Sequence, residues 1–499
     1  MAVLVGAGPG EAGLITVAGA GWLAAAEVVL YDRLANEGLL AACRPDAELL
    51  YVGKRPDAHA LSQEQINALL VDTCRAGKLV VRLKGGDPLV FGRGGEEADA
   101  LAREGLAFRI VPGVTAAIAA GAYAGIPLTD RRTASTLAFV TGHEDPDKGG
   151  STIDFDALAR IDTVVFYMGV GNLAAIAARL ISAGRSPETP VALVQNATWP
   201  NQRTLTATLA TVADAARANH VEPPAVAIVG QVVALRDRIG WLEKLPLWGK
   251  TVLVTRTRRQ ASRLTRCLAD LGAQVIECPA IEIQPPADLS AVDAALRRLG
   301  DFDWLVLTSP NGSAALIERM RAIGLDARAM RGLRLAAVGP ATADVLRDAF
   351  LQPDLLPEKF TTRGLGEALT ADNLTRGKRL LLARADIATD DLPETLRAAG
   401  AIVEEVALYR TVRPAALPDA ALAALREGQV DWVTFTSSST VDNFLALLEG
   451  QGVSLDAVRL ASIGPVTTQT LVEHGLTPAA TADVHTIDGL VDALLGHRR

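Results

Sequence analysis

Short apolar runs alternate with Ala/Leu-rich amphipathic stretches along all 499 residues of the chain. Met1–Val5 precedes Leu14–Ala26, and Leu79–Leu83 precedes Glu96–Glu104. A strand that leads through a helix to another strand builds a parallel sheet, because a parallel connection needs a long crossover. The alternation therefore predicts an α/β protein with largely parallel sheets, and the length allows about two to four domains.

Composition excludes several classes of protein. Hydrophobic residues make up 49% of the chain and charged residues 21%, which is typical of a globular protein. The net charge of −8 gives no basic footprint for nucleic acid. The apolar N-terminal stretch lacks a basic leader and is interrupted by Glu11 and Glu27, so it predicts neither a signal peptide nor a membrane span.

The four cysteines form no CxxC pair and have no clustered histidines beside them. This spacing fits neither a zinc site nor a disulfide framework. We therefore expect a cytoplasmic protein without a metal ion, which binds neither nucleic acid nor membrane.

One segment has the composition of a linker. Leu245–Thr251 contains Pro246 and Gly249, follows a long helical pattern and precedes a new apolar run, Val252–Thr255. We therefore expect two domains, 1–246 and 250–499.

The chain repeats itself after this linker at a nearly constant spacing. The matched pieces are Lys250–Arg256 with Lys378–Arg384, Asp303–Ser309 with Asp431–Ser437, and Leu335–Pro340 with Leu460–Pro465. Two copies are too few for a solenoid, which needs at least about three repeats. The repeat predicts two similar α/β lobes with a cleft between them.

The first glycine-rich loop, Gly6–Gly10, allows more than one function. With Asp32 downstream it is similar to a dinucleotide-binding turn, which would make the protein an oxidoreductase. That fingerprint requires a third glycine where the chain has Glu11, and Pro9 lacks the N–H that would bind pyrophosphate. Two other interpretations of this loop remain. It is either a tight turn that binds no ligand or a loop that approaches a neutral nucleoside or a flat macrocycle.

The segment Val81–Glu97 is more specific. Gly85-Gly86-Asp87-Pro88 ends a predicted strand, and a second glycine cluster follows. A predicted helix then begins with Glu96 and Glu97, whose negative charges interact favourably with the positive end of the helix dipole. Glycines let the backbone approach a ligand closely, and Asp87 can accept hydrogen bonds from ligand hydroxyls.

Together these motifs resemble those of the tetrapyrrole methylase family, and within it those of the uroporphyrinogen-III C-methyltransferases. The resemblance covers most of residues 1–245, and its further motifs are Tyr31–Arg33, Gly53–Arg55, Val111–Thr115, Ala124–Leu128, Thr141–His143, Tyr167–Gly169 and Pro224–Ala225. It implies a two-lobed fold, usually a homodimer, that transfers two methyl groups from S-adenosylmethionine to uroporphyrinogen III. The product would be precorrin-2, which leads to sirohaem or cobalamin.

The resemblance also implies roles for individual residues. Asp32 would accept a proton and Lys54 would donate one, and Arg33 and Arg55 would bind the carboxylates of the substrate. The expected S-adenosylmethionine site consists of Pro9, Gly85, Gly86, Asp87, Val90, Thr115, Ala116, Met168, Ala197 and Ala225. The octa-anionic substrate makes a basic rim plausible, with the further candidates Arg82, Arg93, Arg131 and Arg132. Departures from the family pattern are Glu11, Ala12, Asp130, Ala197 and Gln231, and Asp130 replaces a His at a substrate contact.

In residues 250–499, small hydroxylic residues and glycines follow four predicted strands. These loops are Thr308–Gly312, Val338–Thr342, Thr436–Thr440 and Ile463–Thr467. Ligands of parallel sheets bind beyond the carboxyl ends of strands, where helix N-termini present N–H groups to anions. The same residues could simply cap the following helices. Their repetition favours a shared site for a polyanion.

This half resembles the uroporphyrinogen-III synthases, which implies cyclisation of hydroxymethylbilane with inversion of ring D. The implied lobes are about 286–410 and 250–285 plus 414–499, joined by two strands. Tyr409 would be the catalytic residue, and the implied substrate contacts are Arg256, Ser309, Asn311, Gly339, Ser437, Ser438, Gly464 and Thr467. The product of this half would be the substrate of the other. The alternative is a two-lobed module that senses tetrapyrroles and lacks synthase activity.

Overall fold

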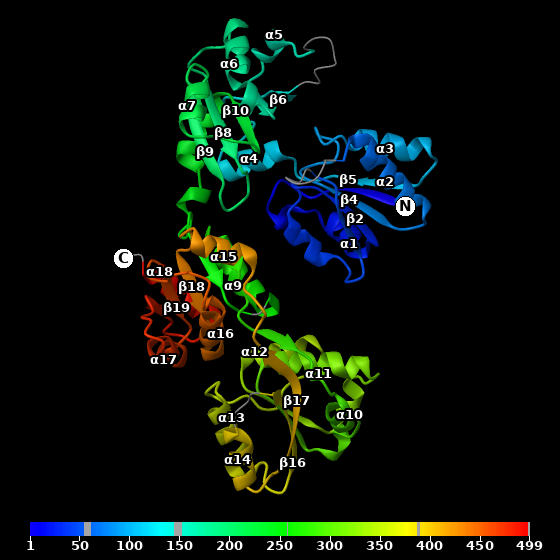
Figure 1. Cartoon of the computed structure of the whole chain (residues 1–499), viewed down its shortest axis with the longest axis vertical. Coiled ribbons are helices and arrows are strands. Elements are labelled where there is room, and N and C mark those ends of the chain that lie inside the picture. The colour runs from blue at the N-terminus through cyan, green and yellow to red at the C-terminus, as the bar shows by residue number, and fades with distance from the viewer. Residues whose placement is uncertain (54–60, 144–151, 257, 387–389, 498–499) are drawn as a thin grey trace. The chain divides into compact units, whose positions relative to one another are not determined.

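The computed structural model describes the chain except residues 54–60, 144–151, 257, 387–389 and 498–499, and the side chains of 258–262 (Figure 1). The chain divides into two compact units. The first unit comprises residues 1–250 and 269–274, and the second comprises residues 251–268 and 275–499. Of the described residues, no helix is long and apolar enough to cross a membrane.

The first sheet of unit 1 is entirely parallel. Its strands lie in the order β3 (Glu48–Tyr51), β2 (Val28–Tyr31), β4 (Val80–Lys84), β1 (Ala2–Gly6) and β5 (Phe108–Val111). Helix α1 (Val17–Ala25) packs on one face, and α2 (Gln63–Arg75) and α3 (Gly94–Arg103) pack on the other. Because both faces are covered, β1 and β4 are buried throughout, as the continuous apolar runs predict.

The second sheet of unit 1 is mixed, which differs from the expected parallel arrangement. Its order is β6 (Leu137–Thr141), β7 (Thr163–Tyr167), β10 (Ala225–Val229), β8 (Pro190–Gln195) and β9 (Arg203–Thr208). Among the pairs between its described strands only β6–β7 is parallel, because β10 runs opposite to both neighbours and the loop from β8 to β9 is too short for a crossover. The helices are α4 (Ala116–Ala124) on one face, with α5 (Phe155–Leu158), α6 (Leu173–Ser182) and α7 (Val212–Ala218) on the other.

The prediction of one long helix before residue 246 is wrong. The chain there forms three short pieces, η5 (Gln231–Leu235), α8 (Arg236–Ile239) and η6 (Leu242–Lys244). The break comes at Gly240, whose ψ of 120° leaves the helical region.

Unit 2 contains two sheets of similar construction. One has the order β13 (Glu282–Gln284), β17 (Ile402–Val412), β16 (Arg379–Ala385), β14 (Trp304–Leu307) and β15 (Arg334–Ala337). The other has the order β12 (Gln274–Glu277), β11 (Thr251–Val254), β18 (Trp432–Phe435), β19 (Arg459–Ser462) and β20 (Ala480–Thr481). The pairs are parallel except β13–β17, which is antiparallel. Thus β13, although within 250–285, joins the sheet of the 286–410 lobe, since it lies beside a connecting strand.

Helices cover the faces of both sheets in unit 2. The first sheet packs against α10 (Ser290–Arg297), α11 (Pro310–Ala322) and α12 (Pro340–Asp348) on one face and α13 (Thr362–Thr370) and α14 (Asp391–Ala398) on the other. The second packs against α15 (Asp419–Arg426), α16 (Ser438–Leu448) and α17 (Pro465–Glu473), while α18 (Ile487–Gly496) contacts β19 and β20. Helix α9 (Arg258–Asp270) follows β11.

Matching hydrogen bonds support the repeat in unit 2. The Asp303 carboxylate accepts a bond from the backbone N–H of Arg379 at 2.8 Å, and Asp431 accepts one from Thr251 at 2.9 Å. Thr361 caps α13 as Thr486 caps α18. Each sheet therefore combines strands from both copies of the repeat.

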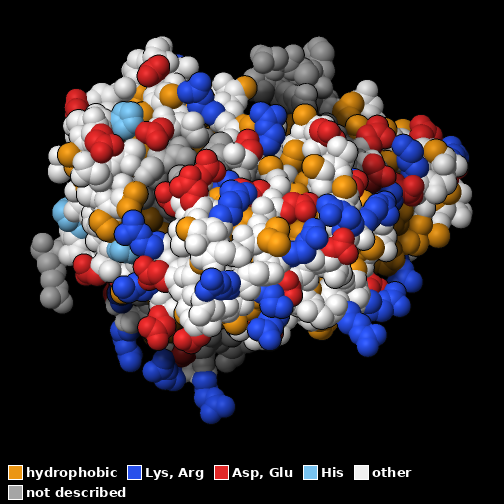
Figure 2. All heavy atoms as spheres, turned by 90° about the horizontal axis from the view of Figure 1, so that it is seen from below, with side chains coloured by type: hydrophobic (Ala, Val, Ile, Leu, Met, Phe, Trp, Pro, Cys, Tyr) orange, Lys and Arg blue, Asp and Glu red, His pale blue; other side chains and the backbone are white. Residues whose placement is uncertain are grey.

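On the face shown in Figure 2, Lys and Arg side chains are interspersed with Asp and Glu side chains. Although the chain as a whole has a net charge of −8, acidic and basic side chains are therefore mixed over the described part of this face.

Candidate active sites of the two halves

Three loops meet backbone to backbone at the carboxyl end of the first sheet. Gly86 N–H donates to the Gly8 carbonyl at 2.7 Å, and Gly8 N–H donates to the Gly86 carbonyl at 3.3 Å. A Cβ on Gly6 would lie 2.5 Å from the Gly113 Cα, so neither position has room for a side chain. Gly86 has a φ of +69°, and its open side faces the start of α4, with Ala116 N 3.8 Å from an ideal Cβ.

Asp87 holds this loop in place. One carboxylate oxygen accepts the N–H of Leu89 at 2.8 Å, and the other accepts the N–H of Gly113 at 3.0 Å. The expected acceptor of ligand hydroxyls therefore also shapes the loop, and it keeps lone pairs for a ligand.

The start of α4 is anchored by Tyr167. The Thr115 and Tyr167 hydroxyls are 2.7 Å apart, and the Tyr167 hydroxyl accepts the N–H of Ala117 at 3.0 Å. Burial raises the pKa of Tyr167. Thr115 is only 5% exposed, so its side chain positions the helix and a ligand would meet its backbone.

The loops that carry Pro9 and Ala197 also lie together. Glu11 N–H donates to the Thr198 hydroxyl at 2.9 Å, and a Cβ on Gly10 would lie 2.5 Å from the Trp199 Nε1. Three predicted positions pack against one apolar cluster that includes Tyr167, and these are Val90, Ala116 and Ala197. Ala225 begins β10 opposite Gln195. The structure thus gathers the predicted cofactor residues into one region of unit 1.

Backbone strain concentrates around these loops. Of the nine non-glycine residues with positive φ that the structure describes, five lie here: Phe91, Arg93, Met168, Asn196 and Thr198. Met168 directly follows β7 and is 54% exposed. Strained backbone beside exposed apolar side chains is typical of a ligand site. An open glycine, an acidic loop residue and exposed Met and Phe side chains fit S-adenosylmethionine, which has a hydroxylated ribose and an apolar ring.

Asp32, directly after β2, is the exposed end of a buried charge cluster. Its carboxylate accepts from the Arg82 Nη2 at 2.9 Å, and Arg82 Nε donates to the Glu97 Oε1 at 3.1 Å. The Lys84 ammonium donates to the same oxygen at 2.9 Å. The exposed fractions of the side chains are 0% for Glu97, 4% for Arg82, 5% for Lys84 and 24% for Asp32.

Two expectations need correction here. Arg82 does not belong to a solvent-facing basic rim, because it is buried and paired. Glu97 does not mainly stabilise the dipole of α3. Its carboxylate is buried and accepts hydrogen bonds from two cations of β4, Arg82 and Lys84. One feature of the sequence could have indicated this buried cluster, namely that two charged residues, Arg82 and Lys84, lie two positions apart in an otherwise apolar strand.

The other basic candidates that the structure describes are exposed, and two of them are paired. Arg93 bonds Glu96 at 2.7 Å, and Arg132 bonds Asp130 at 3.1 Å. Arg132 lowers the pKa of Asp130, which stands where the family pattern has a His. Arg33 and Arg131 are exposed, while Lys54 and Arg55 lie outside the described residues.

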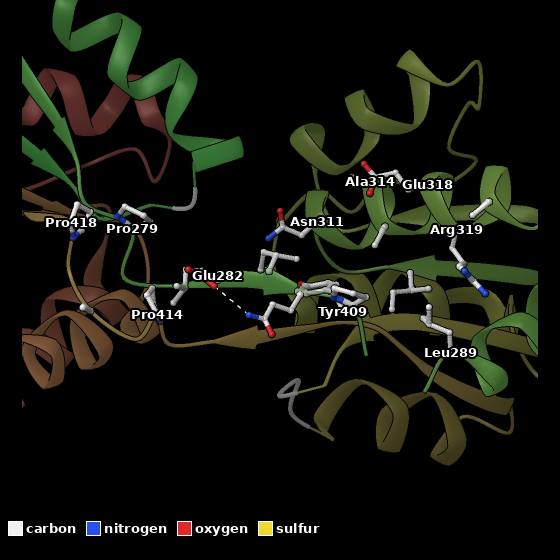
Figure 3. Close-up of a pocket in the computed structure, with 18 of the residues that line it drawn as sticks. Pro279, Glu282, Leu289, Asn311, Ala314, Glu318, Arg319, Tyr409, Pro414 and Pro418 are labelled. Carbon is white, nitrogen blue, oxygen red and sulfur yellow. Dashed lines mark hydrogen bonds between the residues drawn. The ribbon is translucent and has the colours of Figure 1, made fainter. Parts of the chain in front are cut away.

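Unit 2 has a cavity of about 820 Å³, lined by α11, β13, β17 and the segment 414–418. Figure 3 shows Asn311 and Tyr409 in its wall, with Glu282 beside them. The Tyr409 hydroxyl is 2.9 Å from the Ser309 hydroxyl, which caps α11 by accepting the N–H of Gly312. Burial raises the pKa of Tyr409, so its hydroxyl stays protonated and can donate. The structure therefore brings together the predicted Ser309, Asn311 and Tyr409.

The remaining predicted contacts of this half lie at helix starts and are not among the lining residues of that cavity. Ser437 caps α16, and the Ser438 hydroxyl accepts from Thr470 at 2.7 Å, which joins α16 to α17. Arg256 follows β11, and burial lowers its pKa. Thr467 is only 4% exposed, so its side chain faces the interior and a ligand would meet its backbone.

Aromatic rings cover the two predicted glycines. A Cβ on Gly339 would lie 3.2 Å from the Phe360 Cβ, and one on Gly464 would lie 2.8 Å from the His485 ring. Sequence analysis missed both rings, although the repeat spacing places them at equivalent positions. Among the described residues no group of three His, Cys, Asp or Glu could hold a metal ion.

Comparison with known proteins gives the same division of the chain. Residues 1–213 match the family of tetrapyrrole (corrin/porphyrin) methylases, and residues 262–492 match uroporphyrinogen-III synthase HemD. The porphyrin biosynthesis protein HemD of Ruminiclostridium josui is 37% identical over 99% of this chain and 97% of its own length. The uroporphyrinogen-III C-methyltransferase of Bacillus subtilis is 38% identical over 74% of this chain and 76% of its own. A solved uroporphyrin-III C-methyltransferase of Thermus thermophilus, complexed with S-adenosylhomocysteine, is 44% identical, covers 47% of this chain and 99% of its own, and has a TM-score of 0.40.

Proposed function

This chain belongs to the family in which a tetrapyrrole methylase is joined to a uroporphyrinogen-III synthase, and we propose that it catalyses two successive steps. Residues 250–499 cyclise hydroxymethylbilane to uroporphyrinogen III, with inversion of ring D. Residues 1–246 then methylate uroporphyrinogen III twice and give precorrin-2. The two steps fit one chain because the product of the first is the substrate of the second.

The observation that carries the methylase proposal is the meeting of Gly8, Gly86 and Gly113 beside the start of α4. This arrangement leaves backbone open to S-adenosylmethionine, which supplies an electrophilic methyl group when bound. Asp87 fixes the loop and offers a lone pair to ribose hydroxyls. The residues that would hold the cofactor are Pro9, Gly85, Gly86, Asp87, Val90, Thr115, Ala116, Met168, Ala197 and Ala225.

Each methylation would form a carbon–carbon bond on the macrocycle while the carbon–sulfur bond to the methyl group breaks and S-adenosylhomocysteine leaves, and the macrocycle then loses one proton. Asp32 accepts that proton, a role supported by its position at the carboxyl end of β2 and by its partly exposed carboxylate. Lys54 donates a proton in this proposal. Arg33, Arg55 and Arg131 bind carboxylates of the substrate, and the described exposure of Arg33 and Arg131 supports this role.

The synthase proposal depends on the cavity of about 820 Å³ and on Tyr409 in its wall. Tyr409 donates a hydrogen bond to the hydroxyl that leaves hydroxymethylbilane, and Ser309 fixes the direction of the phenol. Ser438 and Gly464 bind carboxylates through backbone N–H groups at the starts of α16 and α17, and Ser437, whose own N–H donates to Thr440, holds the start of α16 in place.

We further propose a homodimer formed by the methylase half. Support comes from large apolar side chains exposed there, namely Leu89, Ile118, Leu137 and Met168. The four cysteines are free thiols, which supports a reducing cytoplasm.

The experiment that tests both activities supplies purified protein with hydroxymethylbilane, with and without S-adenosylmethionine. We expect uroporphyrinogen III without the cofactor, and a doubly methylated product identified by mass and spectrum with it. Ring closure in the unrearranged order would contradict the synthase proposal. Binding of hydroxymethylbilane without rearrangement would favour the sensor alternative. Absence of methylation on supplied uroporphyrinogen III would contradict the methylase proposal.

A further inference from the structure

A buried chain of charged side chains leads from α3 to Asp32. We propose that Glu97, acting through Arg82, is a positioning residue that holds the Asp32 carboxylate in one orientation. This inference rests on the proposed methyl transfer, in which Asp32 accepts a proton.

Arg82 is placed to connect the two carboxylates. It lies opposite Leu30 of β2 in the sheet register, two residues before Asp32. Its Nη2 donates to Asp32 at 2.9 Å, its Nε donates to Glu97 at 3.1 Å, and its Nη1 donates to the Leu83 carbonyl at 2.9 Å. A planar guanidinium fixed on three sides presents Nη2 in one direction.

Glu97 is itself fixed. Its Oε1 accepts from Arg82, from Lys84 at 2.9 Å and from Gln63 at 3.3 Å, and Gln63 also donates to Asn67 at 2.9 Å. Glu97 is completely buried, so the anchor of the chain moves little when solvent or substrate changes.

Stability alone does not explain this cluster. Apolar residues of similar volume often replace buried ion pairs without loss of stability. The four groups balance in charge, two cations against two carboxylates, and the partly exposed member is the one that the methylase proposal uses as a base. A positioning role accounts for both facts.

The cluster also acts on the pKa of Lys84. Burial, followed by the like charge of Arg82, lowers the pKa of Lys84, whereas Glu97 raises it. Two further described charged groups act on the cluster from the start of α3, where Arg93 interacts with Glu97 and Glu96 interacts with Lys84.

The first test is Arg82→Lys, which keeps the charge but loses the fork that reaches both carboxylates. We expect kcat for methylation to fall on the order of 10²-fold, with KM for uroporphyrinogen III and calorimetric affinity for S-adenosylmethionine near those of the parent. Because the positive charge is kept, the acidic limb of the pH–rate profile should stay in place while the plateau falls. A purely electrostatic role predicts normal kcat, which would overturn the inference, as would a loss of cofactor affinity equal to the loss of kcat.

The second test removes the anchor. Glu97→Gln alone would leave two buried cations against one carboxylate, so it is combined with Lys84→Met, which restores the charge balance and retains the Arg82–Asp32 pair. We expect kcat to fall at least about 10-fold while cofactor affinity stays unchanged. Glu104→Gln, just after α3 and exposed, is the matched control. A double variant as active as this control would overturn the inference.

One readout needs no turnover. Crystal structures of the parent and of Arg82→Lys would show whether the Asp32 carboxylate changes its orientation. We expect it to rotate in the variant, and an unchanged carboxylate would overturn the positioning role. An inactive parent would instead count against the proposed function, and the crystallographic comparison would still decide this inference.

Discussion

Asp32 differs from an ordinary surface carboxylate because each of its oxygens has a defined donor. Oδ1 accepts the backbone N–H of Leu34 at 3.0 Å, and Oδ2 accepts from Arg82. The dehydrogenase alternative would have placed this carboxylate on a ribose, whereas the methylase proposal makes it a base.

The variant Asp32→Asn distinguishes these two roles, because the side chain keeps its size but can no longer act as a base. We expect near-normal affinity for S-adenosylmethionine and methyl transfer slower by on the order of 10²-fold, measured by calorimetry and single-turnover kinetics. Asp46→Asn, at an exposed position paired with Arg44, is the control. Collapse of binding with normal single-turnover transfer would identify Asp32 as a cofactor ligand.

Tyr409 gives the corresponding prediction for the second half. Tyr409→Phe removes the hydroxyl that bonds Ser309 but leaves the cap of α11 intact. Because the cavity and backbone N–H groups also assist, cyclisation should slow by roughly 10-fold to 10²-fold and should continue. The rate of uroporphyrinogen III formation measures this, with Tyr123→Phe in the other half as control. Complete loss of activity in a folded variant would show that Tyr409 is indispensable.

At the scale of elements, the loop after β4 decides cofactor binding. Gly86→Val places a β-branched side chain at a φ of +69° and fills the space before α4. Calorimetry should show affinity for S-adenosylmethionine weaker by on the order of 10²-fold, with synthase activity near normal. Gly95→Ala, where a Cβ meets nothing within 4 Å, is the matched control. Unchanged affinity in Gly86→Val would exclude this loop from the site.

The strand β4 and the loop after it show which structural features the sequence could predict and which it could not. The apolar run predicted β4 to within one residue at each end, and the glycines after it predicted a loop. No local pattern could show that Asp87 bonds Gly113 or that Glu97 turns inward, because these bonds join residues that are 26 and 15 positions apart in the sequence. The antiparallel β10 was missed for the same reason, since strand direction depends on neighbours that are distant in sequence.

At the scale of the whole molecule, the position of the boundary near residue 250 makes a prediction. Fragment 1–246 keeps every strand of the first two sheets, so it should fold and methylate supplied uroporphyrinogen III. Circular dichroism, thermal unfolding and the methylation assay measure this. A fragment that folds but needs the second half for turnover would contradict modularity.

The control is a cut after Gly377, which separates β14 from β16 and β11 from β18. Since both sheets of unit 2 lose central pairings, neither 250–377 nor 378–499 should fold alone. Independent folding of either piece would contradict this account of the repeat.

The mixed origin of these sheets also affects synthesis on the ribosome. The methylase half and the sheet of β14, β15, β16 and β17 can each close soon after their last strand emerges. Strand β11 must wait for β18, since Val252 pairs with Trp432 and Thr251 bonds Asp431. During that wait β11 has unpaired N–H and C=O groups, the condition in which nascent chains associate wrongly. A chain that stalls before β18 would therefore expose one incomplete sheet after the other three sheets are complete, and it is this intermediate that a chaperone would need to protect.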